Sequence, residues 1–301
     1  YILDRVSDIE QLQKEIKELK DVYENENKIK KIIVKQLNDI VKKYGQPRKT
    51  EIISDEFVEE ITEEHFIEDY NVKLFLTNDN YIKKIPLVSL RANPEQKIKD
   101  DDYITQEIDA RNKDELLLFS NKTNVYKMKV HELEDHKASV LGEYLTNRLE
   151  LDEDEKIIYI VATGDYKGYM LFSFESGKAA KIDLSSYATK TNRKKLVNAY
   201  SKSYKLIHII YLETDLDLVA YSNIEKVLVF NTSCINSKTT RDSQGVQVLK
   251  EKKGSRMIKV KTLEQAGLSD VEYYRTKNIP AVGCYMKKED KLSQQIELKL
   301  D

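Results

Sequence analysis

A repeated pair of short strands constrains most strongly what this chain can fold into. From residue 70 onward, an apolar strand is followed by polar turn residues and then by a strand that mixes lysine with apolar residues. Four such pairs occur, with equivalent turn positions at Asn80, Thr123, Gly177 and Glu225. The spacings between these positions are 43, 54 and 48 residues. Repeats of this length predict the blades of a propeller.

Additional strands enlarge each repeat. Residues 103–104, 156–161 and 206–212 are expected to form a further strand ahead of three of the pairs, which gives each blade at least three strands. A fifth, irregular unit is expected from residues 257–260 and 281–285 and from the alternating Ile296, Leu298 and Leu300. The fold class is therefore mainly β, a propeller-like domain of about five blades behind a helical segment.

The helical segment is read from its apolar spacing. Apolar residues recur in steps of three and four from Ile2 to Tyr23 and again from Ile29 to Tyr44, interrupted by the sequence ENEN at residues 24–27. This is a coiled-coil pattern and predicts two consecutive helices that end near Tyr44. The stripe must pack against something, either another chain, a preceding part of this chain or, as the alternative, its own domain.

Charge is distributed unevenly along the chain. Residues 1–69 carry 12 basic and 18 acidic side chains, whereas residues 70–301 carry 38 basic and 34 acidic ones. Nine of the acids lie in residues 51–69, which indicates an extended linker, either partly packed or simply solvated. We therefore divide the chain into a helical tail (residues 1–53), an acidic linker (residues 54–69) and a β domain (residues 70–301).

Several functional classes lack support in the sequence. Two cysteines and four scattered histidines give neither a disulfide framework nor a metal site, and no phosphate loop or nucleophile motif occurs. We predict no catalytic residues and no metal. No apolar run approaches the ~20 residues of a membrane helix, and we expect a cytoplasmic, nucleoid-associated protein. The first residues form neither a Met start nor a signal peptide, so we expect a piece of a longer protein.

Two basic runs are the strongest functional signal. Residues 178–205 hold eight basic side chains and one acid, and residues 238–259 hold seven basic side chains and two acids. Both runs are expected in turns and connections at the blade rim. They suit contact with phosphates without reading of bases, although a lysine face that only improves solubility would have the same composition.

The order of these features resembles the C-terminal part of a bacterial type IIA topoisomerase A subunit. The helical segment ends in KYGQPRKTEI (residues 43–52), which is similar to the family's exit from the cleavage domain. Residues 142–145 (GEYL) with 154–157 (DEKI) resemble a blade junction, and residues 240–247 (TRDSQGVQ) resemble a repeat signature. The resemblance implies a β-pinwheel that binds and bends duplex DNA, with topoisomerase IV or gyrase as the enzyme.

The resemblance also implies where function lies. Residues 90–99 (LRANPEQKIK) stand where gyrases carry a box rich in glycine and arginine, and they contain no glycine, which favours topoisomerase IV. The cleavage tyrosine and the ATPase that uses ATP and Mg²⁺ are expected on other domains, so no cofactor is expected here. The implied partners are duplex DNA, a second copy of the A subunit in a homodimer, and the topoisomerase B subunit.

We predict that basic residues of the hairpins, the degenerate box and the two basic runs contact DNA. They are Lys83, Lys84, Arg91, Lys97, Lys190, Arg193, Lys194, Lys195, Lys238, Arg241, Lys252, Lys253 and Arg256. The alternative function is a propeller that serves as a protein-interaction scaffold without DNA binding. An independent enzyme has no supporting set of residues.

Overall fold

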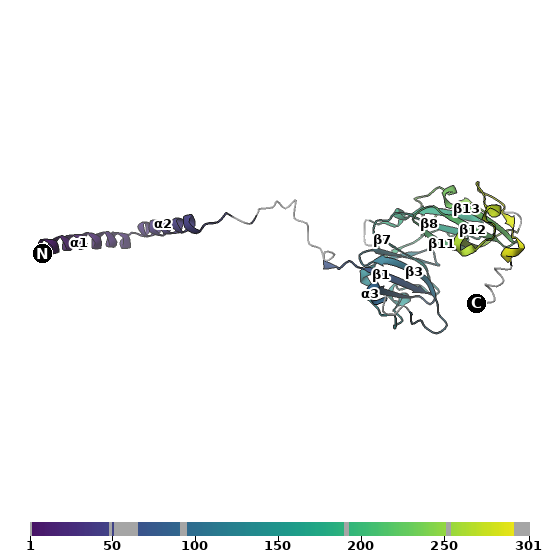
Figure 1. Cartoon of the computed structure of the whole chain (residues 1–301), viewed down its shortest axis with the longest axis horizontal. Coiled ribbons are helices and arrows are strands. Elements are labelled where there is room, and N and C mark those ends of the chain that lie inside the picture. The colour runs from purple at the N-terminus through teal and green to yellow at the C-terminus, as the bar shows by residue number, and fades with distance from the viewer. Residues whose placement is uncertain are drawn as a thin grey trace. The chain divides into compact units, whose positions relative to one another are not determined.

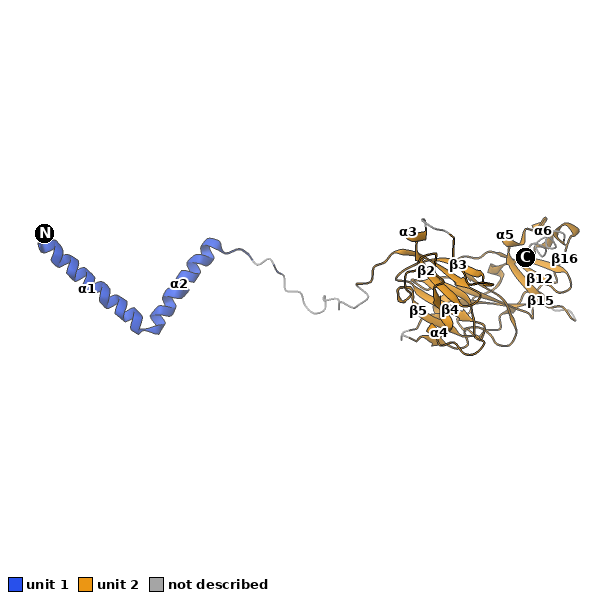
Figure 2. Cartoon of the chain, turned by 90° about the horizontal axis from the view of Figure 1, so that it is seen from below, with its two compact units in different colours: residues 1–62 blue, residues 63–301 orange. Residues whose placement is uncertain are grey.

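The chain divides into two compact units, residues 1–62 and 63–301 (Figure 2). The computed structural model describes residues 2–47, 50, 66–90, 95–189, 193–250 and 254–291. The predicted linker, residues 54–69, lies mostly outside the described residues, and so do Ile296, Leu298 and Leu300.

The first unit contains the two predicted helices, α1 (Ile2–Glu24) and α2 (Glu26–Tyr44). Asn25 separates them and caps α2, because its side chain accepts a hydrogen bond from the Asn27 N–H at 3.1 Å. No residue of either helix is buried within the unit. The apolar stripe along both helices is therefore exposed, as expected of a coiled-coil surface.

The second unit contains four antiparallel four-stranded sheets, which we number as blades 1–4 in chain order (Figure 1). From one edge to the other, blade 1 contains β3 (Ile104–Arg111), β1 (Asn71–Thr77), β2 (Tyr81–Pro86) and β6 (Glu143–Tyr144). Blade 2 contains β7 (Ile157–Thr163), β4 (Glu115–Ser120), β5 (Val125–Lys129) and β10 (Lys195–Leu196). Blade 3 contains β11 (Leu206–Leu212), β8 (Tyr169–Phe174), β9 (Lys178–Asp183) and β14 (Val246–Gln247). Blade 4 contains β15 (Met257–Thr262), β12 (Asp217–Ser222), β13 (Lys226–Asn231) and β16 (Cys284–Tyr285).

The four predicted hairpins are the central strand pairs of these blades. All four turn positions that the repeat placed in register, Asn80, Thr123, Gly177 and Glu225, have positive φ, at 66°, 60°, 80° and 57°. In three of the turns a hydroxyl accepts a hydrogen bond from the backbone N–H four residues later, and the acceptors are Thr77, Ser120 and Ser222. The repeat inferred from the sequence is thus a repeat of backbone conformation.

Two expectations about the strands are corrected. The third strand was expected to belong to the hairpin that follows it in the chain. It pairs instead with the hairpin that precedes it, because the chain crosses back to the free side of that hairpin's first strand. The expected fifth unit is wrong for residues 257–260 and 284–285, which are the third and fourth strands of blade 4. The described residues therefore form four blades.

Inner and outer blade edges are distinguished by a cavity of about 670 Å³. Residues of β3, β7, β11 and β15 all line it, so these four strands form the inner edges. The strands β6, β10, β14 and β16 form the outer edges. Four return segments, residues 130–144, 184–196, 232–247 and 263–285, carry the outer strands back to the blade before. Short helices occur along the chain: α3 (Leu87–Leu90), η3 (Val130–Glu132), α4 (Leu145–Arg148), η4 (Leu184–Tyr187), η5 (Thr232–Cys234), α5 (Leu263–Ala266) and α6 (Val271–Tyr274).

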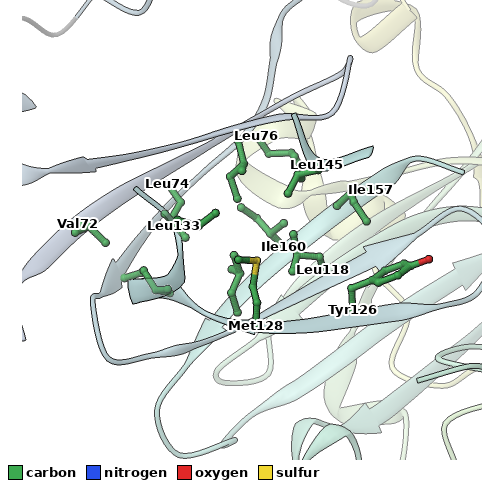
Figure 3. Packing of buried hydrophobic residues seen from close by; sticks show 14 residues of the cluster. Val72, Leu74, Leu76, Leu118, Tyr126, Met128, Leu133, Leu145, Ile157 and Ile160 are labelled. Carbon is green, nitrogen blue, oxygen red and sulfur yellow. The ribbon is translucent and has the colours of Figure 1, made fainter. Parts of the chain in front are cut away.

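The hydrophobic core lies between consecutive blades. One cluster joins blades 1 and 2, and its side chains include Leu74, Leu118 and Ile160 (Figure 3). Two further clusters join blades 2 and 3 and blades 3 and 4. Within the described ranges, no cluster joins blade 4 to blade 1, and the outer faces of those two blades have small clusters of their own.

Candidate nucleic-acid interface

The second return segment is the most basic outer edge of the domain. Its sequence, residues 184–196, contains four basic residues and no carboxylate. The first return segment, residues 130–144, contains four carboxylates and one lysine. Positive charge is therefore concentrated at blade 2, and the rim of blade 1 is acidic.

Arg193 and Lys194 are exposed cations of this edge. They directly precede β10, and the Lys194 carbonyl accepts a hydrogen bond from the Lys127 N–H at 2.8 Å, which fixes the backbone against β5. Neither side chain forms an ion pair with a residue that the structure describes. Both side chains are exposed to solvent.

Lys195 has a different role from its two neighbours. Its ammonium nitrogen lies 3.3 Å from Asp152, 3.9 Å from Glu155 and 5.0 Å from the centre of the Tyr126 ring. A hydrogen bond with Tyr126, together with the two carboxylates, raises the pKa of Lys195. The residue stays charged, but Asp152 and Glu155 partly neutralise its charge.

Glu155 organises the support beneath this edge. Its side chain is fully buried and accepts hydrogen bonds from Ser120 at 2.5 Å, Asn124 at 2.8 Å and Tyr126 at 2.9 Å. Burial alone would raise the pKa of Glu155, but the three hydrogen bonds outweigh it and lower the pKa below its ordinary value. The carboxylate therefore holds the β4–β5 turn and, through Lys195, the outer strand.

Blade 3 adds two basic residues to the outer edge. Lys238 is exposed on the third return segment, which is bound to β9 by hydrogen bonds to the backbone of Lys181 and Asp183. Arg241 is half-buried in the same segment. Arg256 lies elsewhere, just before β15, and pairs with Glu175 at 3.3 Å.

Burial argues against the predicted DNA contacts at Lys83 and Lys84. Lys83 is 4% exposed, and its ammonium donates hydrogen bonds to the side chain of Gln96 and to two backbone carbonyls. Burial lowers the pKa of Lys83. Lys84 is 3% exposed and pairs with Asp135 at 2.9 Å. Both ammonium groups are committed inside the domain, so we remove both lysines from the candidate set.

The remaining predicted residues fall into two groups. Lys97 is exposed on the loop after β2, and its N–H donates to the Ala138 carbonyl at 2.8 Å. The others lie outside the described residues and keep the status of predictions: Arg91, Lys190, Lys252 and Lys253.

The burial of the lysines at one repeat position was not predicted from the sequence. Lys84, Lys127 and Lys181 each stand four residues after the positive-φ turn position, and each pairs with a carboxylate within 3.1 Å. A tyrosine ring also lies within 6 Å of each ammonium group. The signal was the recurrence of lysine at one register, which is not expected of a solvated surface.

Glycines at the start of the outer strands explain two motif matches. Gly142, Gly245 and Gly283 directly precede β6, β14 and β16, and all have positive φ. A Cβ at Gly283 would lie 2.7 Å from the Val227 carbonyl oxygen, and the other two positions are tighter. The GEYL and TRDSQGVQ matches therefore mark the outer edges of blades 1 and 3.

Other kinds of site find no support in the part of the chain that the structure describes. No group of three or more His, Cys, Asp or Glu side chains could hold a metal ion there. No helix in those ranges combines the length and apolar character that a membrane span requires.

The sequence of the chain is similar to those of two bacterial topoisomerase subunits. The chain is 26% identical over 231 residues to the DNA gyrase A subunit of Streptococcus pneumoniae, which covers 73% of the chain and 28% of that protein. It is 30% identical over 194 residues to the DNA topoisomerase 4 A subunit of Bacillus subtilis, which covers 62% of the chain and 24% of that protein. The chain is homologous to the A subunits of DNA gyrase and topoisomerase IV.

The solved structures that match the chain are C-terminal domains of such proteins. The crystal structure of the C-terminal domain of DNA topoisomerase IV matches with a TM-score of 0.56 and 26% identity, over 65% of this chain and 62% of that one. The C-terminal domain of the E. coli protein ParC shares the fold at 14% identity, with a TM-score of 0.52. The β-pinwheel fold of a topoisomerase C-terminal domain is thus confirmed. No family model matches the chain, which spans less than a third of its curated relatives.

Proposed function

We propose that the β domain binds duplex DNA through its phosphates, without sequence preference, and presents it for strand passage by a type IIA topoisomerase. The observation that carries the proposal is the outer edge of blade 2, where Arg193 and Lys194 are exposed and have no ion-pair partner among the described residues. Lys238 and Arg241 extend the positive charge to blade 3. Contacts of this kind bind any duplex and make affinity dependent on salt.

The proposed enzyme relaxes and decatenates DNA with ATP but does not introduce negative supercoils. Wrapping a duplex round the domain requires a continuous positive track, since bending 20–30 base pairs by 40–90° costs about 1–6 kcal/mol. The return segment of blade 1 is acidic, and the acidic run Asp100-Asp101-Asp102 follows the degenerate box. Both features interrupt the track at the blade where a gyrase would begin wrapping.

The partners and cofactors follow from the same homology and are proposals. The cleavage site is proposed to lie in the preceding part of a longer A subunit, and the ATP- and Mg²⁺-dependent activity on the B subunit. The full enzyme would contain two A subunits. Incubating the reconstituted enzyme with relaxed plasmid and ATP tests the proposal, and robust negative supercoiling would refute it.

A salt titration tests DNA binding directly. Contact with roughly 4–6 phosphates predicts that log K falls with log salt at a slope of about −4 to −5. The double variant Arg193→Glu and Lys194→Glu should weaken binding and reduce the magnitude of that slope by about 2. Lys195 is left unchanged because it pairs with Asp152 and Glu155.

The control makes the same change of formal charge at two lysines in the connections between blades, one of which, Lys167, pairs with Asp165 at 2.6 Å. Lys113 and Lys167 are exposed in the connections that precede β4 and β8. The double variant Lys113→Glu and Lys167→Glu should leave the slope within about 0.5 of the wild type. Equal losses in both double variants would indicate a general charge effect. No binding at low salt would favour the protein-interaction scaffold.

A further inference from the structure

A second basic feature lies away from the outer edge. Between blades 2 and 3, at the end of the blades where the hairpin turns lie, the surface is hollowed by a cavity of about 550 Å³. Its walls come from the β4–β5 turn, from β7 and from the segment that leads into β11. The lining residues are Asn121, Lys122, Thr123, Ile158, Tyr200, Ser201, Lys202, Tyr204, Lys205 and Leu206.

The charged residues of the lining are all basic. Three lysines contribute to it and no carboxylate does. Lys202 and Lys205 are exposed and form no ion pair with a described residue. Lys122 donates a hydrogen bond to the Glu153 backbone carbonyl, which leaves its charge without a carboxylate to neutralise it. The three lysines give the lining an excess of positive charge, which favours an anion in the cavity.

The cavity also has an unused hydrogen-bonding group. Thr123 is only 8% exposed, and its hydroxyl has no hydrogen-bond partner among the described residues. Its φ of 60° is rare for a β-branched residue, whereas the equivalent turn position of blade 3 is Gly177. A buried hydroxyl without a partner costs stability, and one in a strained turn is a candidate for contact with a ligand.

Fixed walls hold these groups in place. The Tyr200 hydroxyl donates to the Ser120 carbonyl at 2.7 Å, and its ring stacks on Phe172 at 5.1 Å between centroids. The Ala199 N–H donates to the Thr123 carbonyl at 2.8 Å. Tyr204 is 39% exposed at the mouth, with the Lys178 ammonium 5.0 Å from its ring centre. A ring presented in this way can stack on a planar group.

We propose that this cavity is a phosphate-binding site, in which Lys122, Lys202 and Lys205 neutralise the anion. Lysine ammonium groups and hydroxyls are the donors that phosphate oxygens accept from most readily. The phosphate comes either from a nucleotide in solution or from a DNA strand that leaves the rim. The site does not depend on duplex binding at Arg193 and Lys194, so the two can fail separately.

Calorimetric titration of the whole chain tests the proposal with three probes: inorganic pyrophosphate, a deoxynucleoside triphosphate and a short duplex. The double variant Lys202→Glu and Lys205→Glu should weaken pyrophosphate binding at least about tenfold. The control pair at Lys113 and Lys167 carries the same charge change and should retain wild-type affinity. A thermal melt of each variant confirms that it is folded.

The variants at Tyr204 and at the rim separate the two sources of phosphate. If the nucleotide binds more tightly than pyrophosphate and Tyr204→Ala removes this difference in affinity, the proposal is supported with a free nucleotide as the ligand. Equal binding of both, and weaker duplex binding in the Lys202 and Lys205 variant, supports it with the DNA strand as the source. No pyrophosphate binding, or equal losses in the cavity and control variants, would overturn it, whatever the rim variant does to the duplex.

Discussion

Removing the Glu155 carboxylate should destabilise the β domain more than any other single loss of a charged group at this edge. The side chain is fully buried and accepts three hydrogen bonds of 2.5–2.9 Å from Ser120, Asn124 and Tyr126. In Glu155→Ala these three donors stay buried while their common acceptor is gone. Lys195 also loses the carboxylate that lies 3.9 Å from its ammonium.

The expected magnitude follows from those contacts. A buried donor without an acceptor costs about 1–3 kcal/mol, and removing one partner of a buried charged group costs about 3–5 kcal/mol. We expect a loss near the middle of the range for a buried charged group, about 4 kcal/mol. For a domain of this size, such a loss lowers Tm by roughly 8–16 °C.

Urea denaturation followed by circular dichroism measures this loss. Glu155→Gln keeps the shape and one acceptor oxygen, so it should lose less than Glu155→Ala. Glu153→Ala removes an exposed carboxylate two residues away and should change stability by less than about 0.5 kcal/mol. A loss below about 1 kcal/mol in Glu155→Ala would refute the reasoning, because the three donors would then have other acceptors.

Three further predictions concern single backbone or titrating groups. Thr123→Gly relieves a positive φ and should stabilise the domain by about 0.5–1 kcal/mol in a urea melt; destabilisation would contradict this. Gly245→Ala places a Cβ against the Ala179 carbonyl and should cost about 2–3 kcal/mol, and an unchanged Tm would show that β14 can shift. Burial lowers the pKa of His208 to about 4, so below about pH 6.5 the unfolded chain binds a proton that the folded domain does not. The domain should therefore lose about 1–2 kcal/mol of stability as the pH falls from 7 to 5. Stability curves at both pH values should differ less in His208→Gln than in the wild type, and an equal pH dependence would exclude this histidine as its source.

The hairpins and helices could be predicted because their signals are local. The turn positions have positive φ, and the strand that contains lysine follows each turn in the same register. The helices were likewise set by apolar spacing and by the Asn25 cap. The blade to which each third strand belongs could not be predicted, because adjacency along the chain does not determine which side of a hairpin a strand joins.

The candidate site was predicted only in outline. The density of basic residues pointed to residues 193–195, which lie at an outer blade edge, but sequence could not separate exposed lysines from paired ones. The burial of Lys83 and Lys84 could not be predicted, because burial depends on what covers a strand, and Asp135 and Ala138 come from a distant segment. The phosphate cavity was missed because its walls come together only when blades 2 and 3 pack.

The return segments also set the order in which the domain can be completed during synthesis. Blade 1 starts at Asn71, but its outer strand ends at Tyr144, after the second hairpin has already been made. Until then the outer edge is formed by β2, which ends at Pro86. At about 5–20 residues per second, the ribosome leaves that edge unpaired for about 3–12 s, during which it is open to pairing with other chains. Truncated chains also lose the outer strand of an earlier blade. A chain that stops after Asn231 lacks β14, which is the outer strand of blade 3. A premature stop in this domain therefore removes structure one blade upstream of the sequence that it deletes.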